Sequence, residues 1–293
     1  MSSVDLSQLP VPQVVEQFDF ETIVAQMLAD LQARDPDFTA LVESDPAYKI
    51  LEVCAYREVL VRQRANEAAQ AVMLAYAEDG DLDNLGALFG VTRLTLNPGD
   101  PTQNIAPTME TDTNYRYRIT LAPSAYSVAG PVGAYTYYAL SADPKVVDCS
   151  VTSPTPGQVL ISVLSSDGDG TADAALIAAV AATVGADAVR PLTDEVIVQS
   201  AGIVPYEVTG TYYTFAGPDS TVVSDASMAS LLAYQAAAKK VGRNIPLSAL
   251  YAAIHTSGIE RVDLTSPAAD LFVTDTQAAY CSGINLVYGG VSD

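Results

Sequence analysis

The sequence predicts a multidomain α+β protein: an N-terminal helical region, then small mixed α/β domains with helices packed on sheets. Up to about residue 78, apolar residues recur at the three- and four-residue spacings of helices. From residue 126 onward, short strand-like segments alternate with further helical patterns, which favours helices layered on small sheets. The 293 residues, 49% of them hydrophobic, are enough for two or three cores.

The N-terminal region predicts an arm and two helices. Residues 1–19 contain two prolines and little periodicity, so we expect an extended arm. A first helix is expected over Phe20–Arg34, with Asp19 as its N-cap. An Asp-Pro step at residues 45–46 supplies a cap and a first-turn proline. The second helix is therefore expected to run from Pro46 to about Glu78.

This second helix carries an apolar stripe at alternating spacings of four and three residues. The stripe has nine positions: Ala47, Leu51, Cys54, Glu58, Val61, Ala65, Ala68, Val72 and Ala75. All of them except Glu58 are apolar. Such a stripe predicts a partner helix, and its alanines permit close approach. Arg57 and Arg64 lie together on another face, where ion pairs at the surface or at an interface are expected rather than catalysis. The interface candidates are Leu51, Cys54, Val61, Ala65, Ala68, Val72 and Ala75, with Arg57 and Arg64.

An acidic segment, "EDGDLD", follows the stripe and could in principle bind calcium in an EF-hand loop. Asp79, Asp81 and Asp83 have the spacing of the first three ligands of an EF-hand. The template then requires glycine and glutamate where this chain has Asn84 and Gly90, so the loop fails as a calcium site.

Helix capping explains the segment better. Gly80 is expected to end the long helix, and Asp81 to cap a short one. The short helix is expected to pack back through Leu82, Leu85, Leu88 and Phe89. Residues 95–125 then predict a linker with three prolines and a first strand, "YRYRITLAP".

The remaining chain predicts alternating elements. A helix, "GPVGAYTYYALSA", precedes two strands joined by a Pro-Gly turn, "KVVDCSVTSP" and "GQVLISVLSS". The helix "TADAALIAAVAATVG" and the strands "DEVIVQSA" and "PYEVTGTYYTF" follow. Helices at about Val222–Val241 and Pro246–Thr256, the strand "IERVDLTSP" and a strand near Ile284–Tyr288 complete the order. The expected domains are 1–94, helical; 95–125, linker and first strand; 126–200, central α+β; and 201–293, C-terminal α+β.

Composition excludes several classes of partner. With 14 basic and 35 acidic residues the net charge is −21, which disfavours binding to nucleic acid or anionic lipid. No run of about 18 apolar residues predicts a membrane span, and the first twenty residues do not resemble a secretory signal. Three widely separated cysteines argue against a disulfide framework and favour buried thiols in a reducing compartment.

Catalytic constellations are missing from the sequence, which has one histidine and none of the common nucleophile, phosphate or zinc motifs. The segment "SSDGDGTADAAL" leaves two alternatives open. Asp167 and Asp169 could hold calcium in a binding module, or Asp167 and Asp194 could form the acid pair of a cell-wall glycan hydrolase. A strand-to-helix turn with Asp or Thr capping is the simpler interpretation. No complete ligand set is visible, so neither a metal nor a cofactor is expected.

The quoted segments also resemble a known family. "AYREVLVRQRANEAAQAVMLAYAEDGDLDNLGALFGVTR" is similar to the signature of the baseplate J family of contractile-tailed phages and R-type particles. The similarity continues in "YRYRITLAPSAYSVAGPVGAYTYYALSADPKVVDCSVTSPTPGQVLISVL", "DGDG", "VRPLTDEVIV" and "VGRNIPLSALYAAIHTSGIERVDLTSP". It covers most of residues 50–270 and is weaker at both ends of the chain.

The resemblance implies a structural wedge component of a tail baseplate, in a virion or a tailocin particle assembled in the bacterial cytoplasm, without catalysis. It implies partners of two kinds. A second copy and companion wedge proteins would join through bundled helices. Neighbouring wedges would join through the C-terminal domains into a ring around the tail hub, with sheath or hub as further candidates.

Overall fold

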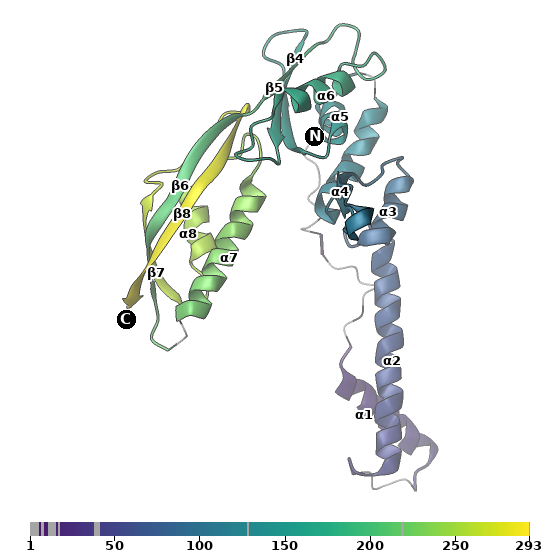
Figure 1. Ribbon diagram of the computed structural model, residues 1–293. Helices are drawn as coiled ribbons and strands as arrows, with labels where there is room; N and C mark the ends of the chain where they lie inside the picture. Colours follow the sequence, from purple (N-terminus) through teal and green to yellow (C-terminus); the bar gives the residue numbers. More distant parts are fainter. Residues whose placement is uncertain are drawn as a thin grey trace. The chain divides into compact units, whose positions relative to one another are not determined.

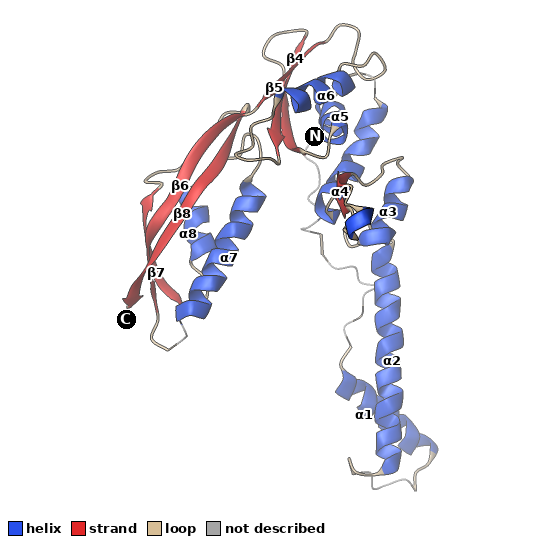
Figure 2. Ribbon diagram, viewed as in Figure 1, coloured by secondary structure: helices blue, strands red, loops and turns tan. Residues whose placement is uncertain are grey.

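The computed structural model describes residues 6, 9–10, 16, 18–37, 42–127, 129–217 and 220–292. The chain forms two compact units, shown in Figure 1. The first comprises Met1–Arg93 and Thr111–Arg116, and the second comprises Leu94–Glu110 and Tyr117–Asp293. Figure 2 shows an α+β architecture, which confirms the predicted fold class. Among the described residues, no helix is both long and apolar enough to cross a membrane.

The first unit is helical and begins as predicted. Helix α1 is Phe20–Arg34, and the Asp19 side chain caps it by accepting a 2.9 Å hydrogen bond from the Thr22 N–H. Helix α2, Pro46–Ala71, has Asp45 as its cap and proline in its first turn. The two helices pack through a small cluster: Ile23, Val24 and Ala55, with Phe18, Phe20, Met27, Tyr48 and Val59 around them. The expected arm over residues 1–19 lies mostly outside the described residues.

Helix α2 is shorter than predicted, because it ends at Ala71 and not near Glu78. A side chain far away in the sequence supplies the reason. The Arg116 guanidinium donates to the carbonyl oxygens of Leu74 and Ala77, each at 2.6 Å. These carbonyls are satisfied without a further helical turn, so the chain can leave the helix there.

The predicted capping of the next helix is wrong. Helix α3 is Asp79–Ala87, so Gly80 and Asp81 lie inside its first turn, and Glu78 stands at the cap without a side-chain hydrogen bond. The Asp79 N–H instead donates to Asp112 at 3.1 Å. Of the four residues expected to pack back, Leu82 is buried and Leu85 is half-buried, but Leu88 and Phe89 are exposed.

The predicted strand "YRYRITLAP" is also wrong, because Asp112–Leu121 forms helix α4. The alternating Tyr-Arg pairs suggested a strand, yet the buried residues follow a helical spacing: Tyr115, Arg118, Ile119 and Ala122. Within the predicted linker, strands β1, Thr95–Asn97, and β2, Thr108–Met109, pair antiparallel on either side of a short 3-10 helix, Pro101–Gln103.

The central part of the second unit confirms the predicted elements. Strands β3, Val146–Thr152, and β4, Gln158–Ser165, pair antiparallel, and β5, Glu195–Ser200, pairs parallel with β4. Helix α6, Ala174–Val184, makes the crossover between β4 and β5. A 3-10 helix, Ala122–Tyr126, precedes helix α5, Val132–Ala142. The core lies between helices and sheet and includes Tyr135, Leu140, Ile161, Val163, Leu176 and Val180.

The C-terminal part holds a second three-stranded sheet in the order β7-β6-β8. Its strands are β6, Gly202–Thr214; β7, Ile259–Ser266, antiparallel to β6; and β8, Gln277–Val291, parallel to β6. Helices α7, Ser220–Ala238, and α8, Leu247–Ile254, cover one face. Strand β8 is longer than the predicted strand near Ile284–Tyr288, because its first half pairs with β6 through small residues that carry little strand signal.

Candidate assembly interface

Among the described residues, α1 covers one side of helix α2 and Glu16 binds Asn66 and Arg62, while many other side chains of α2 are exposed. The helix spans 26 residues, and Ala55 is the buried one among them. Helix α1 covers the side of α2 that bears Tyr48, Ala55 and Val59. Since a helix turns roughly 100° per residue, Val61 lies about 120° around the axis from Ala55, away from α1. The apolar stripe predicted from the sequence therefore does not serve the α1–α2 contact.

The predicted interface residues are largely exposed. Val61 and Val72 are each 70% exposed, and Cys54, Ala65 and Ala68 are also exposed. Leu51 is half-buried, and Ala75, also half-buried, lies beyond the end of α2 at Ala71, so it is not on the helical stripe as predicted. The exposed thiol of Cys54 corrects the expectation that all three cysteines are buried. Most of the stripe is thus available to another chain.

Sequence reasoning missed Ile50 as part of this surface. Its side chain is 63% exposed, and it lies four, eleven and eighteen positions before Cys54, Val61 and Ala68, on the same side of the helix. The helical spacing of Ile50 is visible in the sequence, but Ile50 is not a position of the alternating four-and-three repeat that predicted the stripe. We define the α2 outer face as eight exposed residues: Ile50, Cys54, Arg57, Val61, Arg64, Ala65, Ala68 and Val72.

Arg57 and Arg64 border this face rather than lie on a separate one, because they follow Ile50 by seven and fourteen positions. Arg64 is 3.4 Å from Glu67, but its side chain is 81% exposed. Among the described residues, Arg57 makes no ion pair. In a chain of net charge −21, the α2 outer face thus carries two positive charges and no negative one.

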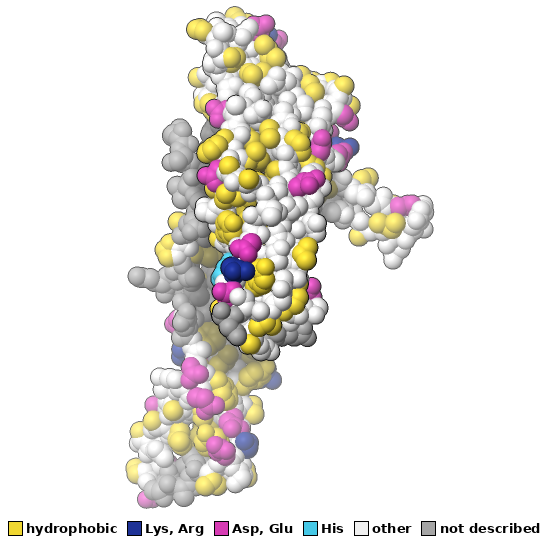
Figure 3. Space-filling view, turned by 90° about the vertical axis from the view of Figure 1, so that its left-hand side faces the viewer, with side chains coloured by type: hydrophobic (Ala, Val, Ile, Leu, Met, Phe, Trp, Pro, Cys, Tyr) yellow, Lys and Arg dark blue, Asp and Glu magenta, His cyan; other side chains and the backbone are white. Residues whose placement is uncertain are grey.

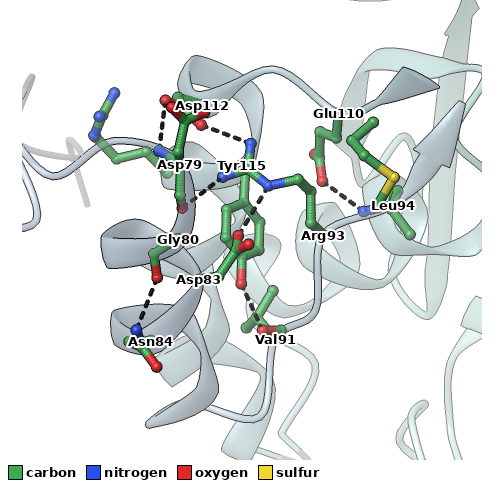
Figure 4. Close-up of polar contacts among 12 residues, drawn as sticks. Asp79, Gly80, Asp83, Asn84, Val91, Arg93, Leu94, Glu110, Asp112 and Tyr115 are labelled. Atoms are coloured by element: carbon green, nitrogen blue, oxygen red, sulfur yellow. Dashed lines mark hydrogen bonds and ion pairs between the residues drawn. The ribbon is translucent and has the colours of Figure 1, made fainter. Parts of the chain in front are cut away.

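A polar cluster joins α3 to the first half of α4, as Figure 4 shows. The Arg93 guanidinium donates to Asp83 at 2.9 Å, to Asp112 at 2.6 Å and to the Asp79 carbonyl at 3.2 Å. It also lies 4.7 Å from the centre of the Tyr115 ring. This cluster and the Arg116 contacts hold α3 and α4 against the end of α2.

The environment of Asp112 shifts its pKa. Partial burial acts to raise the pKa, but the hydrogen bonds from Arg93 and from the Asp79 N–H outweigh it and hold the pKa below its usual value. The charged form of Asp112 is therefore part of the folded arrangement.

The second unit contains a buried ion pair. Arg118 donates to both carboxylate oxygens of Glu110, at 2.9 and 2.6 Å, and also to the Ser141 hydroxyl at 3.1 Å. Glu110 further accepts the Leu94 N–H at 3.2 Å. The two side chains are 5% and 6% exposed, so each charge depends on the other for its solvation.

The acidic pair of the hydrolase hypothesis is not brought together. Asp167 follows the end of β4, whereas Asp194 precedes β5, and β4 and β5 run parallel. The two carboxylates therefore lie at opposite ends of the sheet, roughly 26 Å apart for an eight-residue strand, well beyond the range of about 5–9.5 Å in glycosidases. Each is occupied: Asp167 binds Lys145 at 2.7 Å, and Asp194 accepts the Tyr135 hydroxyl at 2.9 Å.

The "DGDG" turn also has a structural explanation. Asp169 accepts the Thr171 N–H at 2.9 Å, and Asp173 caps α6. Gly168 and Gly170 both adopt positive φ, which glycine tolerates best. Within the described part of the chain, no group of three acidic, histidine or cysteine side chains is arranged to hold a metal.

Comparison with known proteins identifies related sequences. The chain matches the Baseplate J-like N-terminal domain family over residues 43–100 and the Baseplate J-like central domain family over residues 127–200. It is 47% identical over 300 residues to baseplate protein J of Escherichia phage P2, and the alignment covers 99% of each chain. The first matched region contains all of α2, Arg93 and its partners Asp79 and Asp83, and the second contains the central sheet.

Proposed function

The chain belongs to the Baseplate J-like family, and from this premise we propose that it is a structural component of a contractile-tail baseplate wedge. The proposed role is assembly of the baseplate and of its ring around the tail hub, not catalysis. The proposed location is the virion baseplate or a tailocin particle, after assembly in the bacterial cytoplasm.

The single observation that carries the proposal is the α2 outer face. Long amphipathic helices in water are stabilised mainly by packing, yet the eight residues of the α2 outer face are exposed, and α1 packs on a different side of the helix. Alanines at positions 65 and 68 allow a partner helix to approach closely. An exposed apolar stripe of this length is typical of a protein–protein contact.

The charges on this face favour one kind of helix partner. Two copies aligned in parallel and in register would place Arg57 and Arg64 against the same arginines, which is unfavourable. A companion wedge protein whose helix presents carboxylates beside an apolar seam would pair with both arginines. A second copy of this chain could join the same bundle by packing its α2 on another side of the companion protein's helix. It could also pack its α2 against the first copy's α2 in a shifted register, which would separate the arginines.

Cys54 gives a direct test, because it is the exposed thiol of the α2 outer face. Burial raises the pKa of the Cys149 and Cys281 thiols, so a maleimide reagent should act chiefly at Cys54. We expect fast labelling of the free protein and strong protection after co-expression with the tail proteins encoded beside it. Cys54→Ser is the labelling control.

Two results would contradict the proposal. One is a Cys54 thiol that reacts equally fast in the free protein and in purified particles. The other is a protein that remains alone when expressed with every tail protein of its gene cluster.

A further inference from the structure

The second unit contains two three-stranded sheets, and the chain passes from one to the other only once. Strand β5 of the central sheet ends at Ser200, and β6 of the C-terminal sheet begins at Gly202. Ala201, the single residue between them, is 3% exposed. Its N–H donates to the Val163 carbonyl in the central sheet at 2.8 Å, and the Gly202 N–H donates to the Thr276 carbonyl beside β8 at 2.9 Å. The connection therefore leaves no free loop that could absorb a hinge motion.

A small apolar cluster lies where the two sheets meet. Its buried members are Leu164 of β4, Ala201 and Ala278 of β8, and Ile203 and Val241 pack around them. Interfaces between the parts of one chain usually permit relative motion unless they are large and apolar. This cluster is small by that standard, so the polar contacts beside it decide whether the two sheets move independently.

A partly buried carboxylate supplies one of these polar contacts. Asp148 of β3, in the central sheet, accepts the Val241 N–H at 2.9 Å. Val241 itself forms a β-bridge with Ala278 of β8. The next N–H along the chain, that of Gly242, donates to the Gln277 carbonyl at 2.8 Å. The segment after α7 is thus held by both sheets, by β8 through its backbone and by β3 through Asp148.

The "DGDG" turn supplies the other contacts. Gly170 has a φ of 102°, and a Cβ at this position would lie 2.6 Å from Cδ1 of Leu164 and 3.4 Å from Cδ1 of Ile203. Leu164 belongs to the central sheet and Ile203 to the C-terminal sheet. Lys239, which follows α7, donates from Nζ to the Ser166 carbonyl at 3.4 Å. The turn therefore contacts the C-terminal part at two places.

The turn also carries charges of both signs. Charged side chains are sparse on much of the surface that Figure 3 shows. At the turn, by contrast, Asp167 binds Lys145 at 2.7 Å, and this hydrogen bond, with the more distant charge of Lys239, lowers the pKa of Asp167. The Thr171 N–H is the main cause of a lowered pKa of Asp169, and the charge of Lys239 adds to it. Lys239 of the C-terminal part thus attracts two carboxylates of the central part.

We propose that these contacts form a joint that makes the two sheets of the second unit move as one rigid body. A displacement of the C-terminal sheet is then carried to the central sheet instead of being absorbed between them. The proposal gives the "DGDG" turn a positioning role, which neither calcium binding nor catalysis required of it. We define the sheet joint by its polar contacts, its glycine and its buried connection: Asp148, Ser166, Gly170, Lys239 and Val241, with Ala201.

Hydrogen–deuterium exchange of the isolated full-length protein gives the first test, so the outcome does not depend on wedge assembly. The joint amides are those of Ala201, Gly202 and Val241. They should exchange as slowly as the amides in the middle of β4 and β6, because a rigid joint opens only when a sheet unfolds. Joint amides that exchange about a hundredfold faster than both sheets would overturn the proposal.

Two glycines of the same turn give a matched pair of variants. Gly170→Ala places a methyl group against Leu164 and Ile203, and it should speed exchange of the joint amides about tenfold or more, relative to the middle of β4 and β6. Gly168→Ala is the control, because Gly168 also has positive φ but a Cβ there meets no atom within 4 Å. The control should leave the joint amides unchanged. Equal exchange in the two variants would contradict the joint.

Asp148 provides an independent variant. Asp148→Ala removes the acceptor of the Val241 N–H, and the effect is read at Ala201 and Gly202, which do not bond to Asp148. Exchange at both should become faster relative to the sheets, whereas Asp148→Asn keeps an acceptor oxygen and should preserve protection. Asp194→Ala is the control, because it removes a hydrogen-bonded carboxylate at the other end of the central sheet.

Unchanged protection in Asp148→Ala, or an equal loss in Asp148→Asn and Asp194→Ala, would overturn the proposal. If Asp148→Ala does not fold, the glycine pair and the exchange of the natural chain still decide.

Discussion

Helix α2 spans 26 residues and buries one of them, whereas α5 spans 11 residues and buries five. Helix α5 lies against its own sheet and shares a core with α6. Helix α2 combines good helix formers, such as alanine, glutamate, arginine and glutamine, with a short contact to α1 and hydrogen bonds that join Glu16 to Asn66 and Arg62. The difference indicates that α5 is folded by contacts within the chain, while α2 leaves the outer face exposed that the proposed function assigns to other chains.

The largest expected effect separates the two sides of α2. Ala65→Leu with Ala68→Leu adds bulk to the α2 outer face, and overpacking costs about 1–3 kcal/mol per site where a partner helix packs closely. Because both residues are exposed in the single chain, the melting temperature of the isolated protein should hardly change. Binding to wedge partners, measured by co-purification and calorimetry, should be lost or greatly weakened.

Ala55→Leu is the matched control on the same helix. Ala55 is fully buried against α1, so the same added volume should destabilise the isolated chain by about 1–3 kcal/mol. Unchanged melting and unchanged partner binding in the Ala65/Ala68 double variant would remove the α2 outer face from the interface.

The next effect compares an arginine from each unit. Arg118→Ala leaves Glu110 charged and buried, which should cost about 3–5 kcal/mol in the free energy of unfolding. Arg93→Ala should cost less, because the Asp112 side chain that it leaves behind is 26% exposed. Denaturant titration of both variants measures the two losses in the free energy of unfolding and shows which is larger.

A double variant sharpens this comparison. Glu110→Met with Arg118→Met removes both buried charges and should recover most of the stability that Arg118→Ala loses. Equal losses for Arg93→Ala and Arg118→Ala would mean that burial does not set the strength of these two pairs.

A smaller effect is the pH dependence of stability that a single aspartate contributes, which has opposite signs for Asp148 in the second unit and Asp112 in the first. In the second unit, burial raises the pKa of Asp148 above its usual value, although the Val241 N–H donates to it at 2.9 Å. Its contribution to stability is therefore full below the unfolded pKa of about 3.9 and is lost as the pH rises through the folded pKa. Asp148→Asn keeps the acceptor oxygen and should be more stable than the natural chain near neutral pH, with the gain vanishing in acid.

Asp112 in the first unit is expected to behave in the opposite way. Its folded pKa is lowered, so its contribution is present above the unfolded pKa and is lost as the pH falls through the folded pKa. Asp112→Asn should therefore be less stable near neutral pH, and the loss should disappear in strong acid. Thermal melts of both variants across the acid range test the signs, and two variants that respond in the same direction would contradict the assignment.

The smallest expected effect concerns the two arginines of the α2 outer face. Arg57→Ala with Arg64→Ala should weaken partner binding by about 1 kcal/mol or less per site, since exposed ion pairs contribute little. The natural protein should lose partner affinity as salt is raised, and the double variant should lose less. Identical salt dependence in both proteins would show that the partner presents no carboxylates there.

Local chemistry made much of this fold readable from the sequence. The caps at Asp19 and Asp45 predicted where α1 and α2 begin, because a cap is satisfied by backbone groups only a few residues away. The apolar periods of α6 and β4 predicted the central sheet and its helices. The exposed stripe on α2 was likewise visible, since helical spacing depends only on positions along one element.

Contacts between distant residues decided the rest. Arg116 sets the end of α2 through carbonyls about forty positions earlier in the chain, and the burial of Tyr115 and Ile119 makes α4 a helix where alternating residues suggested a strand. Strand β8 owes its length to pairing with β6, some seventy residues before it. Which side of α2 meets α1, and which side is left exposed, also depends on packing between elements. The sequence alone determined where α1 and α2 begin and which helix faces are apolar. Tertiary structure decided where α2 ends, that α4 is a helix and which faces stay exposed, because hydrogen bonds and burial join residues that no local pattern connects.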